Sequence, residues 1–463
     1  MDKKKCSIFN NSQMWKWMIT IILTLIPLFL PASWSIKLFL MITIWAIMVW
    51  AFELISAAVV GILIPVLYVL FKIVPPSVAF GGWTTSTPWI TLGGLIIGSV
   101  FVSSGLVKRI AYKALLLSGG SFVGIVVGLT ITCIMLTPII PSVMAKIALM
   151  VPLVIGFCEA LGVEKKSETA SALMLVVFFA LWSPKMAFLT ASADSIMTAG
   201  ILSEHYEYTL SWLGWAKDMF VPAILWTVVS VTLIFLLKPQ KIQLEKAYLE
   251  EQYENLGKIT LREKKTIGMA VLLLLLLMTD SLHNIAAPWI MIVLGTLCFF
   301  PGIRLMEEKD FNQIKFSIMF FLVGAVSIGN VTVALELDQW LVNLVTPFFV
   351  GQTSFFLVMS IYVFSIITNF TLNPLALIAT LMGPVADICG AMGYPSILGG
   401  YAMIMGFNQA LFPYQIGPLM LVYGYGYLKM GHLIKIMAVR ILVGLIFTAI
   451  VTYPYWRLTG LIN

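Results

Sequence analysis

A succession of long apolar runs constrains the fold of this chain more than any other feature. Such runs occur, among other places, at residues 21–30, 54–71, 170–182, 219–237 and 268–278. A helix needs about 20 mostly apolar residues to cross the hydrocarbon core of a bilayer. We therefore predict an all-α polytopic membrane protein with about ten to twelve spans, because each run can form or anchor one transmembrane helix.

Charged residues are scarce and lie where they set the topology. The 463 residues are 60% hydrophobic and 11% charged, whereas roughly a quarter of the residues of a soluble protein are charged. A net charge of +7 would point to nucleic acid in a soluble chain, but here the basic residues flank apolar runs. The lysines at positions 3–5 and 16 predict a cytoplasmic N-terminus and a retained first helix. We expect contact with the lipid bilayer and no nucleic acid.

Cysteine and histidine residues give no sign of a metal centre or of catalysis. Asp280 and His283 can share a helix face because they are three positions apart, but no nucleophile or second histidine accompanies them. The five cysteines and the two other histidines are scattered without metal-ligand spacing: Cys6, Cys133, Cys158, Cys298, Cys389, His205 and His432. We expect no metal centre, no cofactor and no enzymatic activity.

One long polar segment divides the chain. Residues 238–266 are rich in lysine, arginine and glutamate and show little apolar periodicity, which predicts a cytoplasmic linker. We therefore expect an N-terminal tail with the first helices over 1–50, a first repeat over 51–237 and a second repeat over 267–463.

The two predicted repeats share a weak sequence similarity. Residues 89–98 resemble residues 318–329, and Leu92 and Leu322 are 230 positions apart. A fixed offset of this kind indicates duplication of a structural unit. If each half holds an odd number of spans, the repeats are inverted, which lets a transporter open alternately to each side of the membrane.

Two apolar runs are interrupted at matching positions of the repeats. Residues 141–146 read PSVMAK and residues 368–374 read TNFTLNP. The same offset relates Val143 to Asn373, so the two predicted broken helices are in register. Irregular backbone is tolerated at membrane depth only where it is shielded from lipid or lines a cavity. Paired interruptions therefore indicate a transporter's binding site.

A second pair of irregular segments follows the first. Residues 183–195 contain Lys185 and Asp194, and residues 412–418 read FPYQIGP. Each is either an ordinary loop or a place where a ligand approaches the backbone, because small, hydroxyl and amide residues are frequent in both. Lys185 and Asp194 can pair with each other or with Lys146.

These motifs resemble those of the divalent anion/sodium symporter family, whose members carry dicarboxylates, citrate or sulfate. The dicarboxylate translocator branch has a PSNTAR motif, which residues 141–146 resemble, and an FLTAxAxN motif, which residues 188–195 (FLTASADS) resemble. Weaker matches at residues 50–53 and 279–285 follow in the family's order. The resemblance extends from about residue 50 to the C-terminus.

The resemblance implies a fold and a mode of action. It implies about eleven transmembrane helices and two re-entrant hairpins, near residues 84–107 and 312–333, within two inverted repeats. It also implies a homodimer in a bacterial plasma membrane, whose transport domains move as elevators past a fixed scaffold. The substrate would lie where the hairpin tips meet the broken helices at 141–146 and 368–374.

An anionic substrate requires positive potential inside the membrane, which helix N-termini supply through their unpaired N–H groups. Pro374 suits the first position of a helix, although a simple proline kink is the alternative. Asn373 before it either caps that helix or lines the site. The predicted substrate-binding residues are Ser142, Val143, Met144, Lys146, Thr190, Ser192, Thr371, Asn373, Pro374 and Gly417.

Sodium is the coupling ion that the resemblance implies, but two of the family's side chains are replaced. Val143 and Met144 stand where the family has asparagine and threonine, so the first sodium site is poorer in oxygen ligands. The oxygen atoms remaining for a coupling ion are those of Ser142, Thr368, Asn373 and Asp194. Asp194 could instead take up a proton during transport, which would give proton coupling.

Lys146 is the single residue whose position most strongly indicates a functional role. An ionisable residue within a span is costly unless it is paired or functional, and here it stands where the translocator branch has arginine. Three roles stay open: it binds a substrate carboxylate or sulfonate, its ammonium replaces sodium, or it forms a salt bridge or reaches water.

We predict a secondary active transporter or exchanger of small organic anions, with di- or tricarboxylates as the expected substrates. The alternative is a proton-coupled or exchange-type carrier of a monocarboxylate or sulfonate, because Met144, Phe370, Phe412 and Tyr414 would make the pocket more apolar. An anion channel and an intramembrane enzyme are weaker alternatives.

Overall fold

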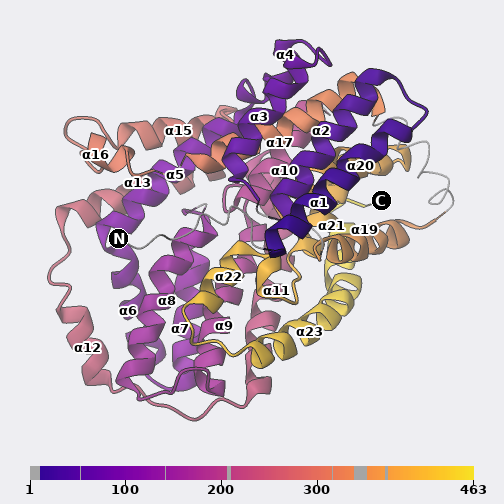
Figure 1. Ribbon diagram of the computed structural model, residues 1–463. Helices are drawn as coiled ribbons and strands as arrows, with labels where there is room; N and C mark the ends of the chain where they lie inside the picture. Colours follow the sequence, from indigo (N-terminus) through magenta and orange to yellow (C-terminus); the bar gives the residue numbers. More distant parts are fainter. Residues whose placement is uncertain are drawn as a thin grey trace, which may run out of the picture.

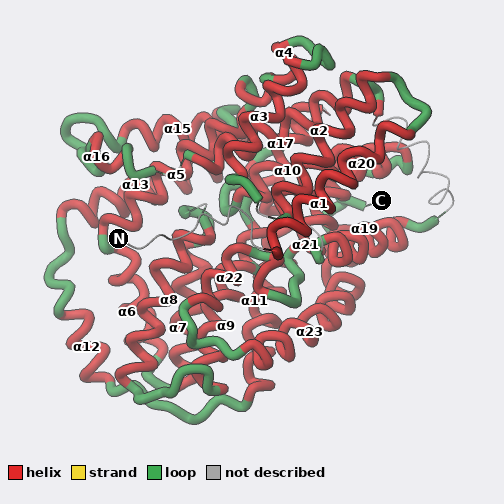
Figure 2. The backbone as a smooth tube through the Cα atoms, viewed as in Figure 1, coloured by secondary structure: helices red, strands yellow, loops and turns green. Residues whose placement is uncertain are grey.

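The computed structural model describes residues 11–52, 54–140, 142–205, 210–314, 316–337, 352–370 and 374–462. Within these ranges the chain is helical, and its extended pairing is limited to an isolated bridge between Ser121 and Gln243 (Figure 2). The predicted all-α fold is confirmed.

The helices of the first half follow one another with short connections (Figure 1). They are α1 (Asn11–Leu25), α2 (Trp34–Ala51), α3 (Ala57–Leu70), α4 (Pro76–Ala79), α5 (Ser86–Ser104), α6 (Leu106–Ser118), α7 (Phe122–Leu136), α8 (Val143–Ala160), α9 (Glu168–Trp182), α10 (Ala193–His205) and α11 (Trp212–Thr232). A short 3-10 turn, η3 (Pro184–Ala187), lies between α9 and α10.

The linker and the second half complete the chain. The linker holds the short helix α12 (Lys246–Glu254), which packs against α6. The second half contains α13 (Leu261–Met278), α14 (Asp280–His283), α15 (Ala287–Leu297), α16 (Glu308–Phe311), α17 (Ser317–Ala334), α19 (Ser354–Thr368), α20 (Pro374–Ala391), α21 (Ser396–Phe407), α22 (Gly417–Gly424), α23 (Met430–Phe447) and α24 (Tyr453–Leu458), with a 3-10 turn, η6 (Pro413–Gln415), before α22.

Many of these helices are long and apolar enough to cross a membrane. In the described part of the chain, seven helical segments combine a length of 18 residues or more with sufficient apolar character, and several shorter apolar helices accompany them. Large apolar side chains remain exposed on their outer faces, such as Leu442, Ile446 and Ile450 on and beyond α23. A soluble protein rarely exposes contiguous apolar surface of this kind, so these faces suit contact with lipid. The predicted number of eleven spans stays a prediction.

Equivalent helices recur at a nearly constant spacing. The starts of α5 and α17, α7 and α19, and α8 and α20 differ by 231 or 232 positions, and those of α9 and α21 by 228. The packing repeats too, because α9 contacts both α7 and α8 while α21 contacts both α19 and α20. Contacts between the halves are reciprocal: α3 packs on α17, α15 packs on α5, α10 packs on α20 and α22 packs on α8.

The described residues of 84–107 and 312–333, where we expected re-entrant hairpins, contain no helical turnaround. Each region instead contains one uninterrupted helix, α5 and α17 respectively. The polar interruptions near residues 141 and 369 are likewise not kinks within one helix. They separate α7 from α8 and α19 from α20. The physical reason is that the polar, proline-containing segments provide a chain reversal, whereas the glycines in α5 and α17 serve helix packing.

Glycines allow the closest contacts between the halves. A Cβ on Gly61 of α3 would lie 2.3 Å from the Phe320 carbonyl oxygen of α17, and one on Gly93 of α5 would lie 2.4 Å from the Met291 carbonyl carbon of α15. Because both obstacles are backbone atoms, these helices cross at a distance that only glycine permits. The small residues thus explain the glycine pattern seen in both repeats.

The two halves run in opposite directions relative to the linker. The turn before α7 contacts the linker, because Phe122 N donates to Ile242 O at 3.1 Å. The start of α23 lies on this side as well, since Lys435 Nζ donates to Leu236 O at 3.1 Å. The start of α19 instead meets the opposite end of the helical segment that begins with α23 and continues into α24. Ser354 Oγ lies there 2.8 Å from Tyr453 Oη. Equivalent helices α7 and α19 therefore begin at opposite sides, as inverted repeats require.

Candidate substrate site

The first polar interruption ends in a capped helix N-terminus. Helix α8 begins at Val143, and the Ser142 hydroxyl accepts a hydrogen bond from Ala145 N at 3.2 Å. Serine is favoured at this position because its oxygen satisfies one of the N–H groups that the first turn leaves unpaired. Val143 is buried, whereas the Met144 side chain is 43% exposed. Pro141, the start of the motif, lies outside the described residues.

Lys146 lies in the first turn of α8 and is fully buried. Its ammonium has no hydrogen-bond partner within the described residues. A buried ammonium without a partner is expensive in an apolar surrounding. Among the described residues Lys146 forms no salt bridge, and its side chain does not reach the surface. The roles predicted for it in substrate and ion binding stay predictions.

The break between α9 and α10 contains a buried ion pair. Lys185 Nζ donates to the Asp194 carboxylate, and both side chains are almost completely buried. The Lys185 ammonium also lies 3.4 Å from the centre of the Trp182 ring. Of the pairings considered from the sequence, the one between Lys185 and Asp194 is the one that forms. The Asp194 carboxylate is therefore already engaged by a lysine other than Lys146.

The two predicted hydroxyl residues of this break are buried and bonded to protein groups. Thr190 Oγ1 donates to Pro138 O at 3.4 Å and accepts from Trp212 Nε1 at 3.1 Å. Ser192 Oγ lies 3.1 Å from Ser195 Oγ. Thr190 thus ties the break between α9 and α10 to the segment between α7 and α8, which brings two of the predicted polar segments together.

The second half has a matching helix start. Helix α20 begins at Pro374, which is buried, so the predicted helix start at this proline is confirmed. Thr371 and Asn373 lie outside the described residues. The Thr368 hydroxyl donates to carbonyl groups of its own helix, to Phe364 O at 2.9 Å and Ser365 O at 3.2 Å.

Asn369 joins the second interruption to the break that follows α21. Its side-chain Nδ2 donates to Gln409 O at 2.7 Å, and its own carbonyl accepts from Gln415 Nε2 at 3.1 Å. Among the residues that the structure covers, nothing bonds to its buried Oδ1 atom. This connection is the counterpart of the bond from Thr190 in the first half.

Gly417 marks the N-terminus of α22, which packs against α8. A Cβ added at Gly417 would meet no atom within 4 Å, so packing does not require glycine here. The free space beside the first turn is consistent with its predicted place near a ligand. Whether it contacts one stays a prediction.

Arg440 of α23 is a central residue that the sequence interpretation missed. It is fully buried and donates to two side-chain hydroxyls, of Ser183 and Ser230, both at 3.0 Å. It also donates to the Asn408 carbonyl at 2.7 Å, to Asn408 Oδ1, and to Gln409 Oε1 at 3.1 Å. These bonds use all five N–H donors of a guanidinium group. Arg440 therefore holds the break after α9 and the break after α21 together.

Sodium is a poor fit to the first half of the site. The Ser142 hydroxyl caps α8, the Asp194 carboxylate is engaged by Lys185, and the Lys146 ammonium adds a positive charge. Sodium, a hard cation, would need several oxygen ligands there. In the second half, the unpartnered Asn369 Oδ1 is a buried oxygen of the required kind, and the predicted ligand Asn373 lies outside the described residues.

The polytopic helical fold, the paired polar interruptions and the buried cation define a secondary transporter and not an enzyme. Residues 11–462 match the family described as the sodium:sulfate symporter transmembrane region, and the chain belongs to this family. The family resemblance seen in residues 141–146 and 188–195 is thus confirmed.

Individual relatives are distant. A protein of Cupriavidus necator described as a membrane protein is 28% identical over 65% of this chain, and the match spans 63% of that protein, slightly less than two thirds of its length. The L-tartrate/succinate antiporter of Escherichia coli is 23% identical, with 83% of this chain and 80% of the antiporter covered.

A solved structure shares the fold. The crystal structure of the Alcanivorax borkumensis YdaH transporter superimposes with a TM-score of 0.53, covering 82% of this chain and 88% of that protein. The sequence identity is 13%, so this comparison concerns the fold alone.

Proposed function

We propose that this protein moves small organic anions, di- or tricarboxylates, across the membrane by alternating access. The observation that carries the proposal is the buried, unpartnered ammonium of Lys146, one turn after the capped N-terminus of α8. The ammonium and the helix N-terminus together supply the positive potential that a carboxylate requires. The relationship to a tartrate/succinate antiporter supports the dicarboxylate class.

In the first half of the site, the described residues favour exchange or proton coupling over sodium coupling. Lys146, buried in the first turn of α8, can supply the positive charge that a sodium ion would otherwise contribute to this half of the site. A carrier that keeps this cation must offset it with a bound anion in both outward-facing and inward-facing states, which favours exchange of one anion for another. Proton uptake by Asp194 is the second route to coupling.

A monocarboxylate or sulfonate is the alternative substrate class. The rings of Phe370 and Phe412 meet edge to face at 6.4 Å, and Tyr414 stacks on Phe412 at 5.8 Å. This aromatic cluster adjoins the interruption between α19 and α20, so it would accommodate the apolar part of a substrate with a single acidic group.

The assembly and membrane placement are part of the proposal. We infer a homodimer in a bacterial plasma membrane, with the N-terminus and the linker on the cytoplasmic side. The bacterial antiporter relative and the lysines flanking the first apolar run support this placement. Elevator movement of the transport domains and the proposed repeat boundaries belong to this proposal as well.

Uptake by proteoliposomes tests the function. The purified protein is assayed with labelled dicarboxylates, tricarboxylates, monocarboxylates and sulfonates, with and without sodium gradients, proton gradients or internal anion. We expect saturable uptake that internal dicarboxylate accelerates and that does not require sodium. Absence of uptake of every anion by folded protein would refute the proposal, and uptake that depends strictly on sodium would refute the coupling.

Replacing Lys146 by methionine tests the residue that carries the proposal. The Lys146→Met variant keeps the length of the side chain without its charge, so substrate affinity should fall at least about tenfold, the loss of one charge-assisted bond of about 1.5–3 kcal/mol. Lys165→Met, at the exposed end of the loop after α8, is the matched control. Unchanged affinity and unchanged ion dependence in Lys146→Met would remove Lys146 from the site.

A further inference from the structure

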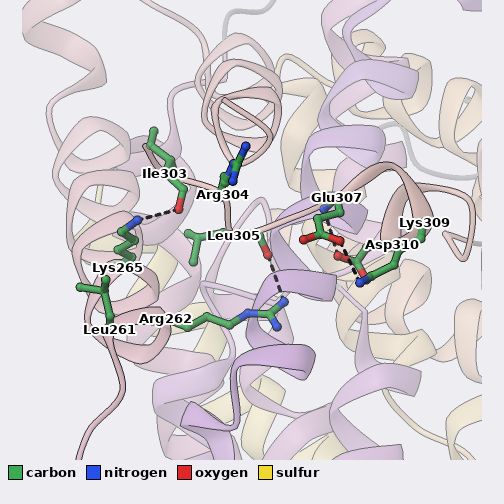
Figure 3. A pocket seen from close by; sticks show the side chains of 9 residues that line it. All are labelled: Leu261, Arg262, Lys265, Ile303, Arg304, Leu305, Glu307, Lys309 and Asp310. Atoms are coloured by element: carbon green, nitrogen blue, oxygen red, sulfur yellow. Dashed lines mark hydrogen bonds and ion pairs between the residues drawn. The ribbon is translucent and has the colours of Figure 1, made fainter. Parts of the chain in front are cut away.

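A basic pocket lies at the linker side of the protein, away from the candidate substrate site (Figure 3). It is a cavity of about 250 Å³ between the first turn of α13 and the loop that leads from α15 to α17. Its charged lining residues are Arg262, Lys265, Arg304, Glu307, Lys309 and Asp310. Cations therefore outnumber carboxylates in the lining by four to two.

The two cations contributed by α13 are held in place without being neutralised. Arg262 donates to Leu305 O at 3.1 Å and to Ser103 Oγ at 2.9 Å. Lys265 donates to Ile303 O at 3.0 Å and to Gly302 O at 2.5 Å. Carbonyl and hydroxyl oxygens orient these side chains without neutralising their charges, and Figure 3 marks the bonds to Leu305 and Ile303.

The two carboxylates of the lining are occupied within their own turn. Glu307 pairs with Lys309 at 2.8 Å, and Asp310 Oδ2 accepts from Glu307 N at 3.0 Å, which caps the short helix α16. Arg304 is exposed and forms no ion pair with a described residue. The bond from a backbone N–H leaves the charge of Asp310 in place. Arg262, Lys265 and Arg304 outnumber this one carboxylate and thus form a cluster of net positive charge, which we name the basic cluster.

The surroundings place the basic cluster at the edge of the lipid. Leu261 in the first turn of α13 is 68% exposed, and Val271 and Leu275 along the same helix are more than half exposed. Phe300, at the end of the loop nearest to the pocket, is exposed as well. These apolar side chains suit contact with acyl chains, while basic residues at the end of such a face meet the headgroups.

We propose that the basic cluster binds the phosphate group of an anionic membrane lipid in the cytoplasmic leaflet. Arginine presents paired N–H donors that match two phosphate oxygens, and lysine adds a point charge. Helix α13 contributes two of the cations and the loop contributes the third, so the bound phosphate would join these two elements. The exposed apolar face of α13 would hold the acyl chains, which a free phosphate ester lacks.

Lipid retention measured by native mass spectrometry tests this proposal on the full-length protein in detergent. The probes are phosphatidylglycerol and phosphatidylcholine of equal chain length. We expect preferential retention of phosphatidylglycerol, and a loss of about tenfold in Lys265→Gln/Arg304→Gln, since 1.4 kcal/mol of lost charge-assisted bonding corresponds to tenfold. Lys264→Gln is the control for Lys265, because it removes one lysine charge from the same turn but does not line the pocket.

A single-residue variant and a displacement measurement distinguish lipid binding from the alternatives. Arg304→Gln alone changes an exposed loop residue and should lower retention several-fold without altering thermal unfolding. Glycerol 3-phosphate and inorganic phosphate at millimolar concentration should fail to displace phosphatidylglycerol; displacement would overturn the lipid assignment in favour of a free phosphate ester. Retention in the double variant equal to that in Lys264→Gln would overturn the site itself.

Discussion

At the scale of the residue, two buried cations in this protein differ in whether their N–H groups have hydrogen-bond partners. Arg440 uses all its N–H donors on oxygens of the two helix breaks and of Ser230 in α11, whereas the Lys146 ammonium has no partner in the described part of the chain. A buried cation whose donors are all bonded holds its partners in place. We therefore assign Arg440 to the architecture of the site, and the binding of a ligand by Lys146 remains part of the proposal.

Arg440→Met should destabilise the protein by about 2–4 kcal/mol, because several buried acceptors would lose their donor and each costs about 1–3 kcal/mol when left unpaired. Arg457→Met is the control, since Arg457 is exposed in the last turn of α24. Thermal unfolding of both variants in detergent measures the difference. A melting temperature for Arg440→Met equal to that of the control would contradict the structural role.

The sequence predicted the helix start at Pro374 because the preferences of a helix N-terminus are local, whereas it indicated Ser142 as a ligand and not as the cap of α8. It did not predict the role of Arg440, whose partners Ser183 and Asn408 are 257 and 32 positions away. A single arginine in an apolar run can equally mark topology or reach water, and only tertiary contacts decide. The pairing of Lys185 with Asp194 was one of the open alternatives for the same reason.

At the scale of the element, close helix crossings connect the two repeats. Gly324 of α17 faces Gly61 of α3, and Gly295 of α15 faces Gly93 of α5. Small residues at such contacts let backbones approach within van der Waals distance, which is the main source of helix association inside a membrane. The sequence repeat around these glycines was visible, but the repeat alone does not say whether glycine forms a hairpin tip or a crossing. The hairpins were expected over α5 and α17 because the family resemblance implied two of them, and the repeat did not show which segments form them.

Gly93→Ala tests the crossing of α5 with α15. The new methyl group would lie 2.4 Å from the Met291 backbone, so the helices must separate, at a cost of about 1–3 kcal/mol. Gly268→Ala in α13 is the control, because no atom lies within 4 Å of its added Cβ and alanine is the better helix former. Unfolding in detergent should show a loss for Gly93→Ala and none for Gly268→Ala; equal effects would argue against the crossing.

At the scale of the whole molecule, inversion of the repeats means that the polar interruption of each repeat is approached from a different side of the membrane. The segments between α7 and α8 and between α19 and α20 approach from opposite sides, because α7 begins beside the linker and α19 begins beside the far end of the α23 region. A movement that closes the path through one repeat can then open the path through the other. The order of apolar runs indicated two halves, but their relative direction depends on contacts such as Ser354 with Tyr453.

Chemical labelling of single cysteines tests this inverted arrangement in the membrane. Lys258 is exposed in the linker and Gln352 is exposed before α19. In a Cys6→Ser background, where the four remaining cysteines are buried, a membrane-impermeant maleimide added to intact cells should label Gln352→Cys and not Lys258→Cys. Inside-out vesicles should reverse the result. Labelling of both positions from the same side would contradict the inversion, and with it the physical basis for alternating access, because equivalent tips of parallel repeats would open to one side only.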